Sequence, residues 1–154
     1  MTGSEPSHSI HVAVVRFVSR FIGEAGVDPD DRIEGDVASS VYWGYMINMG
    51  WGLLAVGWFL ALVVIGVPLQ FVFGDRVGNV VACTVVGASF FCLAGSAEAV
   101  WRRYVYVPRA RRLANRGRPD ASEDALRRSL PPNTSLVFQA AIGALAVVIT
   151  AVNL

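Results

Sequence analysis

Ionisable residues inside apolar stretches are the first place to look for chemistry, because a charge within a membrane is costly and is usually kept for a function. Glu98 lies near the end of one such stretch, and Arg102 follows it one helical turn later. This spacing predicts an ion pair between the two side chains. Since a proton- or sodium-coupled transporter needs a carboxylate at mid-depth, we do not expect ion-coupled transport.

Polar residues at one common depth form the second candidate site. If the apolar stretches alternate in direction, four side chains fall in the same leaflet: Asn48, Ser96, Glu98 and Gln139. They could hydrogen-bond to one another and fix the register of the helices, or receive a polar group of a ligand. The other interpretation is that polar residues are simply tolerated near an interface.

Metal-binding and catalytic patterns are weak throughout the chain. His8 and His11 offer two ligands at helical spacing with no third nearby, and the acidic run from Asp28 to Asp36 fails the spacing of an EF-hand loop. We find no nucleophile, base and orienting residue in a recognisable arrangement. The sequence therefore predicts no metal site, no cofactor and no enzymatic activity.

The composition indicates a membrane protein. Hydrophobic residues make up 54% of the 154 residues, and the mean hydropathy is +0.49. Three apolar stretches are long enough to span a bilayer, at about 42–67, 77–100 and 136–152. We predict an all-α fold with three transmembrane helices in a membrane domain of residues 42–154. Pro68, Phe71 and Phe73 should mark the end of the first span, and a tight loop at residues 74–76 should reverse the chain.

The N-terminal segment differs from this domain. Between Ile10 and Ala25 the apolar residues recur at helical spacing opposite Arg16 and Arg20, which predicts an amphipathic helix in the interface or packed on the bundle. An acidic linker, residues 27–40, follows it. We therefore treat residues 1–41 as a separate N-terminal region.

Arginine is concentrated between the second and third spans, where residues 101–134 contain nine arginines and the loop between the first two spans contains one. The positive-inside rule then places the N-terminus and this loop in the cytoplasm and the C-terminus outside. All thirteen basic residues are arginine, a bias that we attribute to GC-rich bacterial coding, so the expected location is the bacterial plasma membrane.

The same loop should fold as a short helical hairpin. Pro108 is expected to end the helix that leaves the second span. Ser122 should cap a short helix that carries Arg127 and Arg128 in its last turn, and the two prolines at 131 and 132 should end it.

The arginine-rich loop is also the main candidate binding surface. The arginines expected to contact anionic lipid head groups or an acidic protein are Arg102, Arg103, Arg109, Arg111, Arg112 and Arg116. We do not expect nucleic acid as a partner. Small residues within the spans, such as Gly87, Gly95 and Gly143, allow close helix packing within the chain or in a homo-oligomer or larger complex.

These features predict an accessory or scaffold subunit that assembles through its helices and binds through its arginine-rich loop. The alternative is an oligomeric pore-forming or membrane-perturbing protein, holin-like or effector-like. The spans lack the polar stripe that a water-filled pore needs, which favours the first interpretation.

Overall fold

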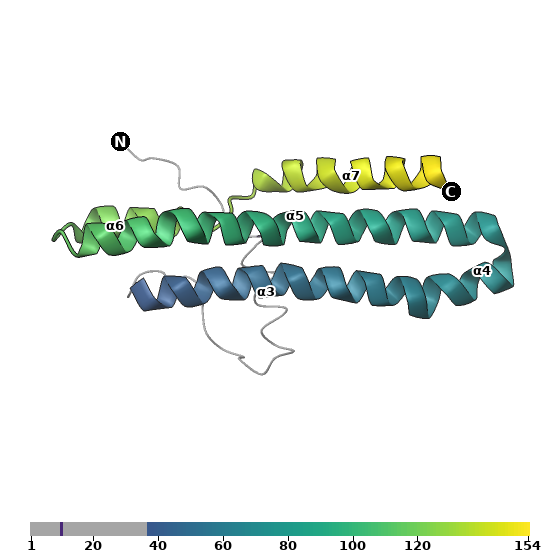
Figure 1. The fold of residues 1–154 in the computed structure, drawn as a ribbon, viewed down its shortest axis with the longest axis horizontal. Helices are drawn as coiled ribbons and strands as arrows, with labels where there is room; N and C mark the ends of the chain where they lie inside the picture. The colour runs from purple at the N-terminus through teal and green to yellow at the C-terminus, as the bar shows by residue number, and fades with distance from the viewer. Residues whose placement is uncertain (1–9, 11–36) are drawn as a thin grey trace. The chain divides into compact units, whose positions relative to one another are not determined.

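The computed structural model describes residue 10 and residues 37–154, with side chains from residue 46 onward as well as that of Ile10. The regular elements of this part are helical: α3 (Val37–Ala61), the π-helix η1 (Leu62–Gly66), α4 (Val67–Phe73), α5 (Asp75–Ala114), α6 (Pro119–Arg127) and α7 (Ser135–Asn153). Figure 1 shows them in chain order. The prediction of an all-α fold is confirmed for the described residues. The predicted amphipathic helix and most of the acidic linker lie outside them.

Three helical stretches are long and apolar enough to cross a membrane: Met46–Phe73, Asp75–Ala114 and Ser135–Asn153. The prediction of three membrane-spanning helices is confirmed at this level. The third stretch matches the predicted span to within one residue at each end. Its 19 residues cover about 28 Å, close to the thickness of the hydrocarbon core.

The helix that contains the first span begins earlier, and the span ends later, than predicted. Residues 37–40, expected in the acidic linker, already belong to α3, and Pro68 lies inside the continuing helix rather than at its end. Pro68 has no amide to donate, so it removes one hydrogen bond of the helix. The π-helical turn just before it, Leu62–Gly66, is the local adjustment that lets the helix continue to Phe73. Only Gly74, at φ 84°, then separates α4 from α5.

Helix α5 is also longer than predicted, because it passes through Pro108 without ending. It extends unbroken over 40 residues, or about 60 Å. The carbonyl group of Tyr104 loses its usual partner at Pro108, but Tyr104 is 75% exposed. A freed carbonyl group costs less on an exposed face of a helix than in a packed interior, which is consistent with a proline at this position.

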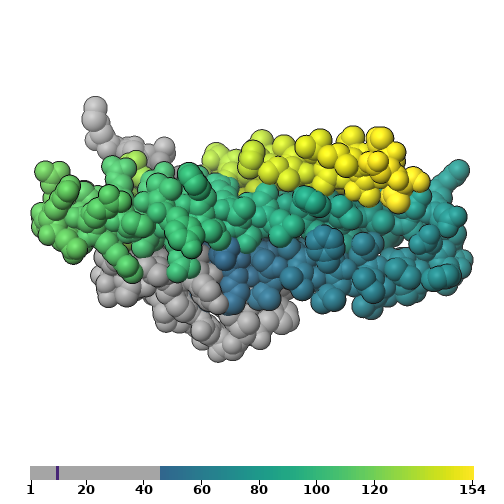
Figure 2. All heavy atoms as spheres, viewed as in Figure 1, coloured from purple at the N-terminus to yellow at the C-terminus, as the bar shows by residue number. Residues whose placement is uncertain are grey.

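The chain divides into two compact units. The second unit comprises Trp51–Gly95 and Leu136–Leu154. In it, the end of the first span and α4 run antiparallel to the first half of α5, and α7 lies along the other side of α5 (Figure 1). The space-filling view shows the yellow atoms of α7 lying along α5 (Figure 2).

Small residues determine how closely these helices approach. A Cβ atom added to Gly87 would lie 3.0 Å from the carbonyl oxygen of Gly143. One added to Gly95 would lie 2.9 Å from the ring of Trp51, which itself packs edge-on against Phe91 at 5.6 Å. The close packing expected of these glycines is therefore present within a single chain.

The first unit comprises Met1–Gly50 and Ser96–Ser135. Here α6 returns along the end of α5 and buries Ala125 and Leu126 against Ala110, with Leu113 packed beside them. The turn between the two helices contains Gly117 at φ 69°, a conformation that glycine adopts without strain. Ile10 belongs to the same unit, and its amide donates to Oδ1 of Asn133 at 3.3 Å.

The predicted cap of the short helix is wrong. α6 begins at Pro119, three residues before Ser122, because a proline in the first turn is already set to the helical φ angle and needs no amide partner. Ser122 lies inside the helix and is buried. Its hydroxyl donates to the carbonyl oxygen of Ala110 at 3.0 Å, so it joins α6 to α5.

Candidate binding surface

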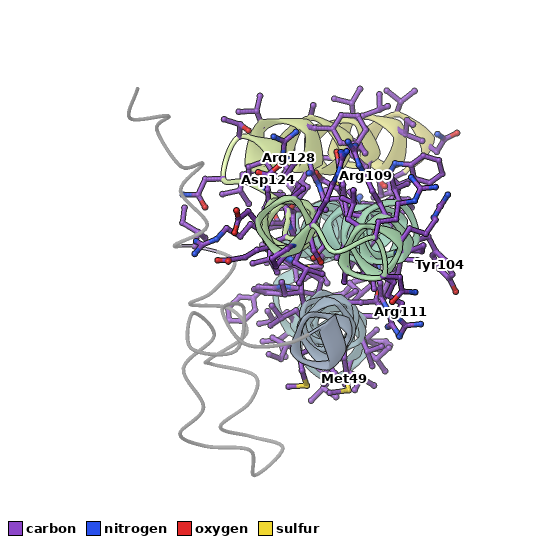
Figure 3. All side chains as sticks on the ribbon, turned by 90° about the vertical axis from the view of Figure 1, so that its left-hand side faces the viewer. Met49, Tyr104, Arg109, Arg111, Asp124 and Arg128 are labelled. Atoms are coloured by element: carbon purple, nitrogen blue, oxygen red, sulfur yellow. The ribbon has the colours of Figure 1, made fainter. Side chains whose placement is uncertain are left out.

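The part of α5 beyond residue 100 has one buried face and one exposed face. Tyr106, Val107 and Ala110 are buried or half-buried and lie toward the inside, while Trp101 and Tyr104 are 70% and 75% exposed. Further along the same exposed face the aromatic side chains give way to arginines. Figure 3 shows Tyr104 and Arg111 on the same side of the helix.

Three arginines of this region are held in ion pairs. Arg102 binds Glu98 at 2.9 Å, as the sequence spacing predicts, and Arg127 and Arg128 bind Glu123 and Asp124 at 3.1 and 3.0 Å. Arg103 is half-buried and also has an interaction of its own. Two of the six predicted binding arginines, Arg102 and Arg103, are therefore engaged within the chain.

Five other arginines are exposed and form no ion pair with any described residue. We call these five residues the basic tip: Arg109, Arg111, Arg112, Arg116 and Arg118. The first four were predicted from the sequence, and Arg118 was not. Arg112 donates only to the carbonyl oxygen of Pro108, at 3.3 Å. The labelled Arg109 and Arg111 project from different sides of the helix in Figure 3, so the tip presents charge over a wide angle.

Local helix chemistry accounts for part of this charge. Arg111 and Arg112 lie in the last turn of α5, where positive side chains offset the partial negative charge of the helix end. Arg116 and Arg118 lie beyond the helix, on either side of Gly117. The dipole of α5 therefore explains two of the five arginines and leaves the concentration of the others to be explained.

The aromatic residues give the basic tip a position relative to a bilayer. Tryptophan and tyrosine favour the membrane interface, so exposed Trp101 and Tyr104 are suited to that level. Ala114, at the end of α5, lies about 20 Å further along the helix axis. The head-group layer is only about 5–8 Å thick on each side, and salt screens charges beyond about 8 Å. If α5 spans a bilayer at the usual tilt, its end at Ala114 is therefore expected past the head groups.

The four polar residues predicted to share a depth divide between the two units. Within the first, the hydroxyl of Ser96 donates to Oδ1 of Asn48 at 2.7 Å and lies 3.2 Å from the carbonyl oxygen of the same residue. Glu98 is paired with Arg102 instead. Gln139 belongs to the second unit, where it is fully buried beside Gly95. The structure thus joins Asn48 to Ser96.

Among residue 10 and residues 37–154, no group of three or more histidine, cysteine, aspartate or glutamate side chains is placed to hold a metal ion. The two cysteines, Cys83 and Cys92, are both free thiols within α5. The surface therefore offers mainly guanidinium groups, which form charge-assisted hydrogen bonds to carboxylates or phosphates.

Comparisons with known proteins found no relative of the chain. No protein-family model matches the chain, and neither a curated protein nor a solved structure is significantly similar to it. The function must therefore be inferred from the surface itself.

Proposed function

We propose that the chain is a membrane-anchored accessory protein whose basic tip binds an acidic surface of a partner protein. The observation that carries this proposal is the basic tip itself: five exposed arginines without an ion pair to a described residue, at the end of an unbroken 40-residue helix. Neighbouring Arg127 and Arg128, at the end of α6, are paired with Glu123 and Asp124. The contrast between paired and unpaired arginines indicates where a partner's carboxylates would bind.

A partner in solution accounts for the length of α5 better than lipid does. Arg102 and Arg103 lie next to Trp101, at the level where anionic head groups would contact them. The basic tip begins two turns later, and its far end, beyond Ala114, lies outside the range of screened attraction to a flat bilayer. Lipid head groups are therefore the proposed partners of Arg102 and Arg103, and an acidic protein is the proposed partner of the basic tip.

The proposed location is the bacterial plasma membrane, with the basic tip and the N-terminus in the cytoplasm and the C-terminus outside. The distribution of arginines supports this orientation, because nine lie in residues 101–134 and one in the loop between the first two spans. A tip of this charge would then face the compartment in which acidic cytoplasmic proteins are available.

Assembly with other membrane helices is part of the proposal. Many large apolar side chains of α4 and α7 are exposed, among them Phe71 at 87% and Val137 at 75%. Lipid can cover them, and so can a second copy or another membrane subunit. The pore alternative gains no support from these exposed faces, because a water-filled channel needs polar side chains along its wall.

A direct test uses the full chain in nanodiscs of zwitterionic lipid and polyglutamate as an acidic probe. Arg112→Gln with Arg116→Gln removes two charges from the basic tip. Arg127→Gln with Arg128→Gln removes two charges from α6 and is the matched control. At about 1.5–3 kcal/mol for each charge-assisted hydrogen bond, the first variant should weaken binding at least tenfold.

The control variant should bind polyglutamate within about twofold of the unmodified chain, because its two arginines are already paired with carboxylates. Equal weakening by both variants would show that overall charge, and not the unpaired tip, attracts the probe. Dissipation of the membrane potential on expression would favour the pore instead.

A further inference from the structure

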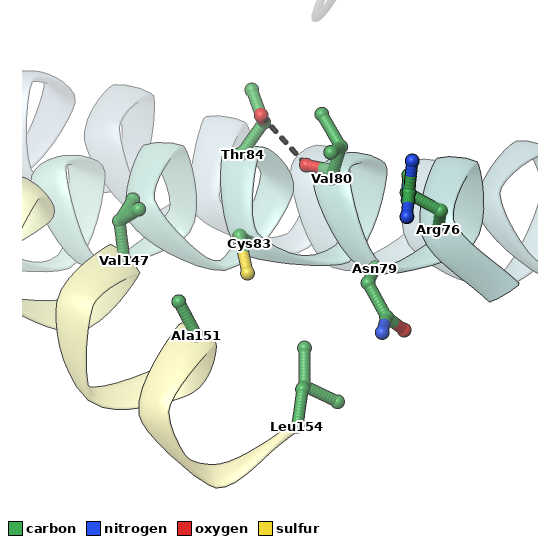
Figure 4. Close-up of a pocket in the computed structure, with 8 residues that line it drawn as sticks. All are labelled: Arg76, Asn79, Val80, Cys83, Thr84, Val147, Ala151 and Leu154. Carbon is green, nitrogen blue, oxygen red and sulfur yellow. Dashed lines mark hydrogen bonds between the residues drawn. The ribbon is translucent and has the colours of Figure 1, made fainter.

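A groove lies between α5 and α7 near the ends of both helices, within the second unit. Its volume is about 620 Å³, which falls in the range of small-molecule sites. Figure 4 shows the wall from α5 above and the wall from α7 below, with Cys83 and Asn79 pointing from α5 toward α7. The lining consists of Arg76, Asn79, Val80, Cys83, Thr84, Val147, Ala151 and Leu154.

The groove exists because two rigid helices touch at one level and leave space at another. They meet where Gly87 faces Gly143 and Val147, and a Cβ atom on Gly87 would be only 2.4 Å from a methyl group of Val147. One turn further along α7 the lining residue is Ala151, whose single methyl group leaves the space open. The groove therefore follows from the positions of small residues on both helices.

Its chemistry changes along its length. Most of its lining is formed by aliphatic and thiol groups of Val80, Cys83, Val147 and Ala151. Thr84 adds no free polar group to this apolar lining, because its hydroxyl donates to the carbonyl oxygen of Val80 at 2.9 Å. Arg76 and Asn79 provide the polar groups at the end nearest the start of α5. Such a groove is complementary to an amphiphile with a long apolar chain and a polar head.

The charge of the head group follows from Arg76. This guanidinium is exposed and forms no ion pair with a described residue, and Asp75 next to it accepts a hydrogen bond from Gln70 at 3.2 Å. It also lies in the first turn of α5, where free amide groups and the helix dipole favour an anion. In a spanning helix that begins at Asp75, this turn reaches the level of lipid phosphates.

We propose that the α5–α7 groove binds one anionic glycerophospholipid, with its phosphate at Arg76 and Asn79 and one acyl chain along Cys83, Val147 and Ala151. The bound lipid fills space between the two helices that no described side chain fills. It thereby supports the packing of α7 on α5. This site is separate from the basic tip and does not depend on the proposed function of the tip.

The test uses the delipidated full chain in detergent, titrated with phosphatidylglycerol or with phosphatidylcholine of the same acyl chains, and counts bound lipids by native mass spectrometry. Arg76→Gln removes the cation, Ala151→Phe fills the groove, and Arg118→Gln removes an exposed arginine elsewhere. We expect one tightly held phosphatidylglycerol per chain. Arg76→Gln should weaken it about fivefold, Ala151→Phe should abolish it, and Arg118→Gln should leave it unchanged.

Thiol chemistry at Cys83 gives a second readout that does not depend on the groove-filling variant. With Cys92 replaced by alanine, a membrane-permeant maleimide should react with Cys83 more slowly in phosphatidylcholine nanodiscs that also contain phosphatidylglycerol. Equal binding of both lipids, equal losses in the Arg76 and Arg118 variants, or no protection of Cys83 would each overturn the proposal.

Discussion

Gly143 lies so close to Gly87 that a Cβ atom added to Gly143 would stand 2.8 Å from the carbonyl oxygen of Gly87. The partner atom belongs to the backbone, so it cannot move aside as a flexible side chain can. Close approach of this kind gains dispersion contacts over the whole length of the helices, which is the main attraction between helices in lipid. The pairing of α7 with α5 therefore depends on the absence of side chains at two positions.

Gly143→Ala should destabilise the protein by about 1–3 kcal/mol, because the added methyl group forces the two helices apart. Gly57→Ala is the matched control, since a Cβ atom there would meet nothing within 4 Å. The control should be neutral or stabilising by up to about 1 kcal/mol, as expected for alanine in a helix. Unfolding in mixed detergent micelles measures both, and equal effects of the two variants would show that the contact is not tight.

The hydrogen bond between Ser96 and Asn48 should contribute a measurable coupling energy. A double-mutant cycle with Ser96→Ala and Asn48→Ala should give about 0.6 kcal/mol, the usual value for a hydrogen bond between membrane helices. Repeating the cycle with Thr84→Ala in place of Ser96→Ala provides the control, because Thr84 bonds only within its own helix. A coupling near zero for the first cycle would mean that the polar pair does not hold α3 to α5.

The sequence predicts the three spanning helices well, because a long apolar stretch in a membrane protein has few structures open to it. It fails at the prolines. Pro108 was expected to end a helix and Pro68 to mark the end of the first span, and both lie inside helices. The cost of a proline depends on whether the freed carbonyl can be compensated, here by a π-helical turn and by exposure at Tyr104. Whether the freed carbonyl is compensated depends on tertiary structure, and the proline and the residue before it do not reveal it.

The candidate binding surface was likewise predictable from the sequence only in part. Residue types alone identify the arginine-rich loop, and the spacing of Glu98 and Arg102 predicts their ion pair. The same spacing also fits the ion pairs of Arg127 and Arg128. Residue types do not reveal that Arg118 stays unpaired, because that depends on where the short helix begins. Pro119 sets that start, and a preference for proline in the first turn was the signal available for it. The α5–α7 groove has no sequence signal, since it is defined by packing between distant residues.

Ser122→Ala should loosen α6 without unfolding the spans. The substitution leaves the contact of Ala125 and Leu126 with Ala110 in place. It removes the hydrogen bond to the carbonyl oxygen of Ala110, a loss of about 1 kcal/mol. Hydrogen exchange should become about fivefold faster for the amides of Pro119–Arg127 that have protons, and stay unchanged in α7. The exposed Thr134→Ala is the control. Unchanged exchange in α6 would show that Ser122 does not tie the two helices together.

The basic tip should lie in water and not among lipid head groups. With Cys83 and Cys92 replaced by alanine, a spin label at Asn115→Cys should be fully accessible to a water-soluble paramagnetic reagent. A label at Trp101→Cys should be less accessible and should sense oxygen dissolved in the bilayer. Adding phosphatidylglycerol should not change the first label, because Asn115, beyond the end of α5, is further from the head groups than salt allows their field to reach. Immobilisation of that label by anionic lipid would assign the tip to the membrane surface.

The central claim is that the basic tip binds an acidic protein, and site-specific photo-crosslinking in the native membrane tests it most directly. A photoreactive phenylalanine at Asn115, which is exposed between Arg112 and Arg116, probes the tip without removing a charge. We predict a protein adduct whose crosslinked segment is rich in aspartate and glutamate, and which disappears when Arg112, Arg116 and Arg118 are replaced by glutamine. The same label at Ala144 in α7 should not give this adduct. Adducts with lipid only, or a protein adduct that persists without these arginines, would contradict the account.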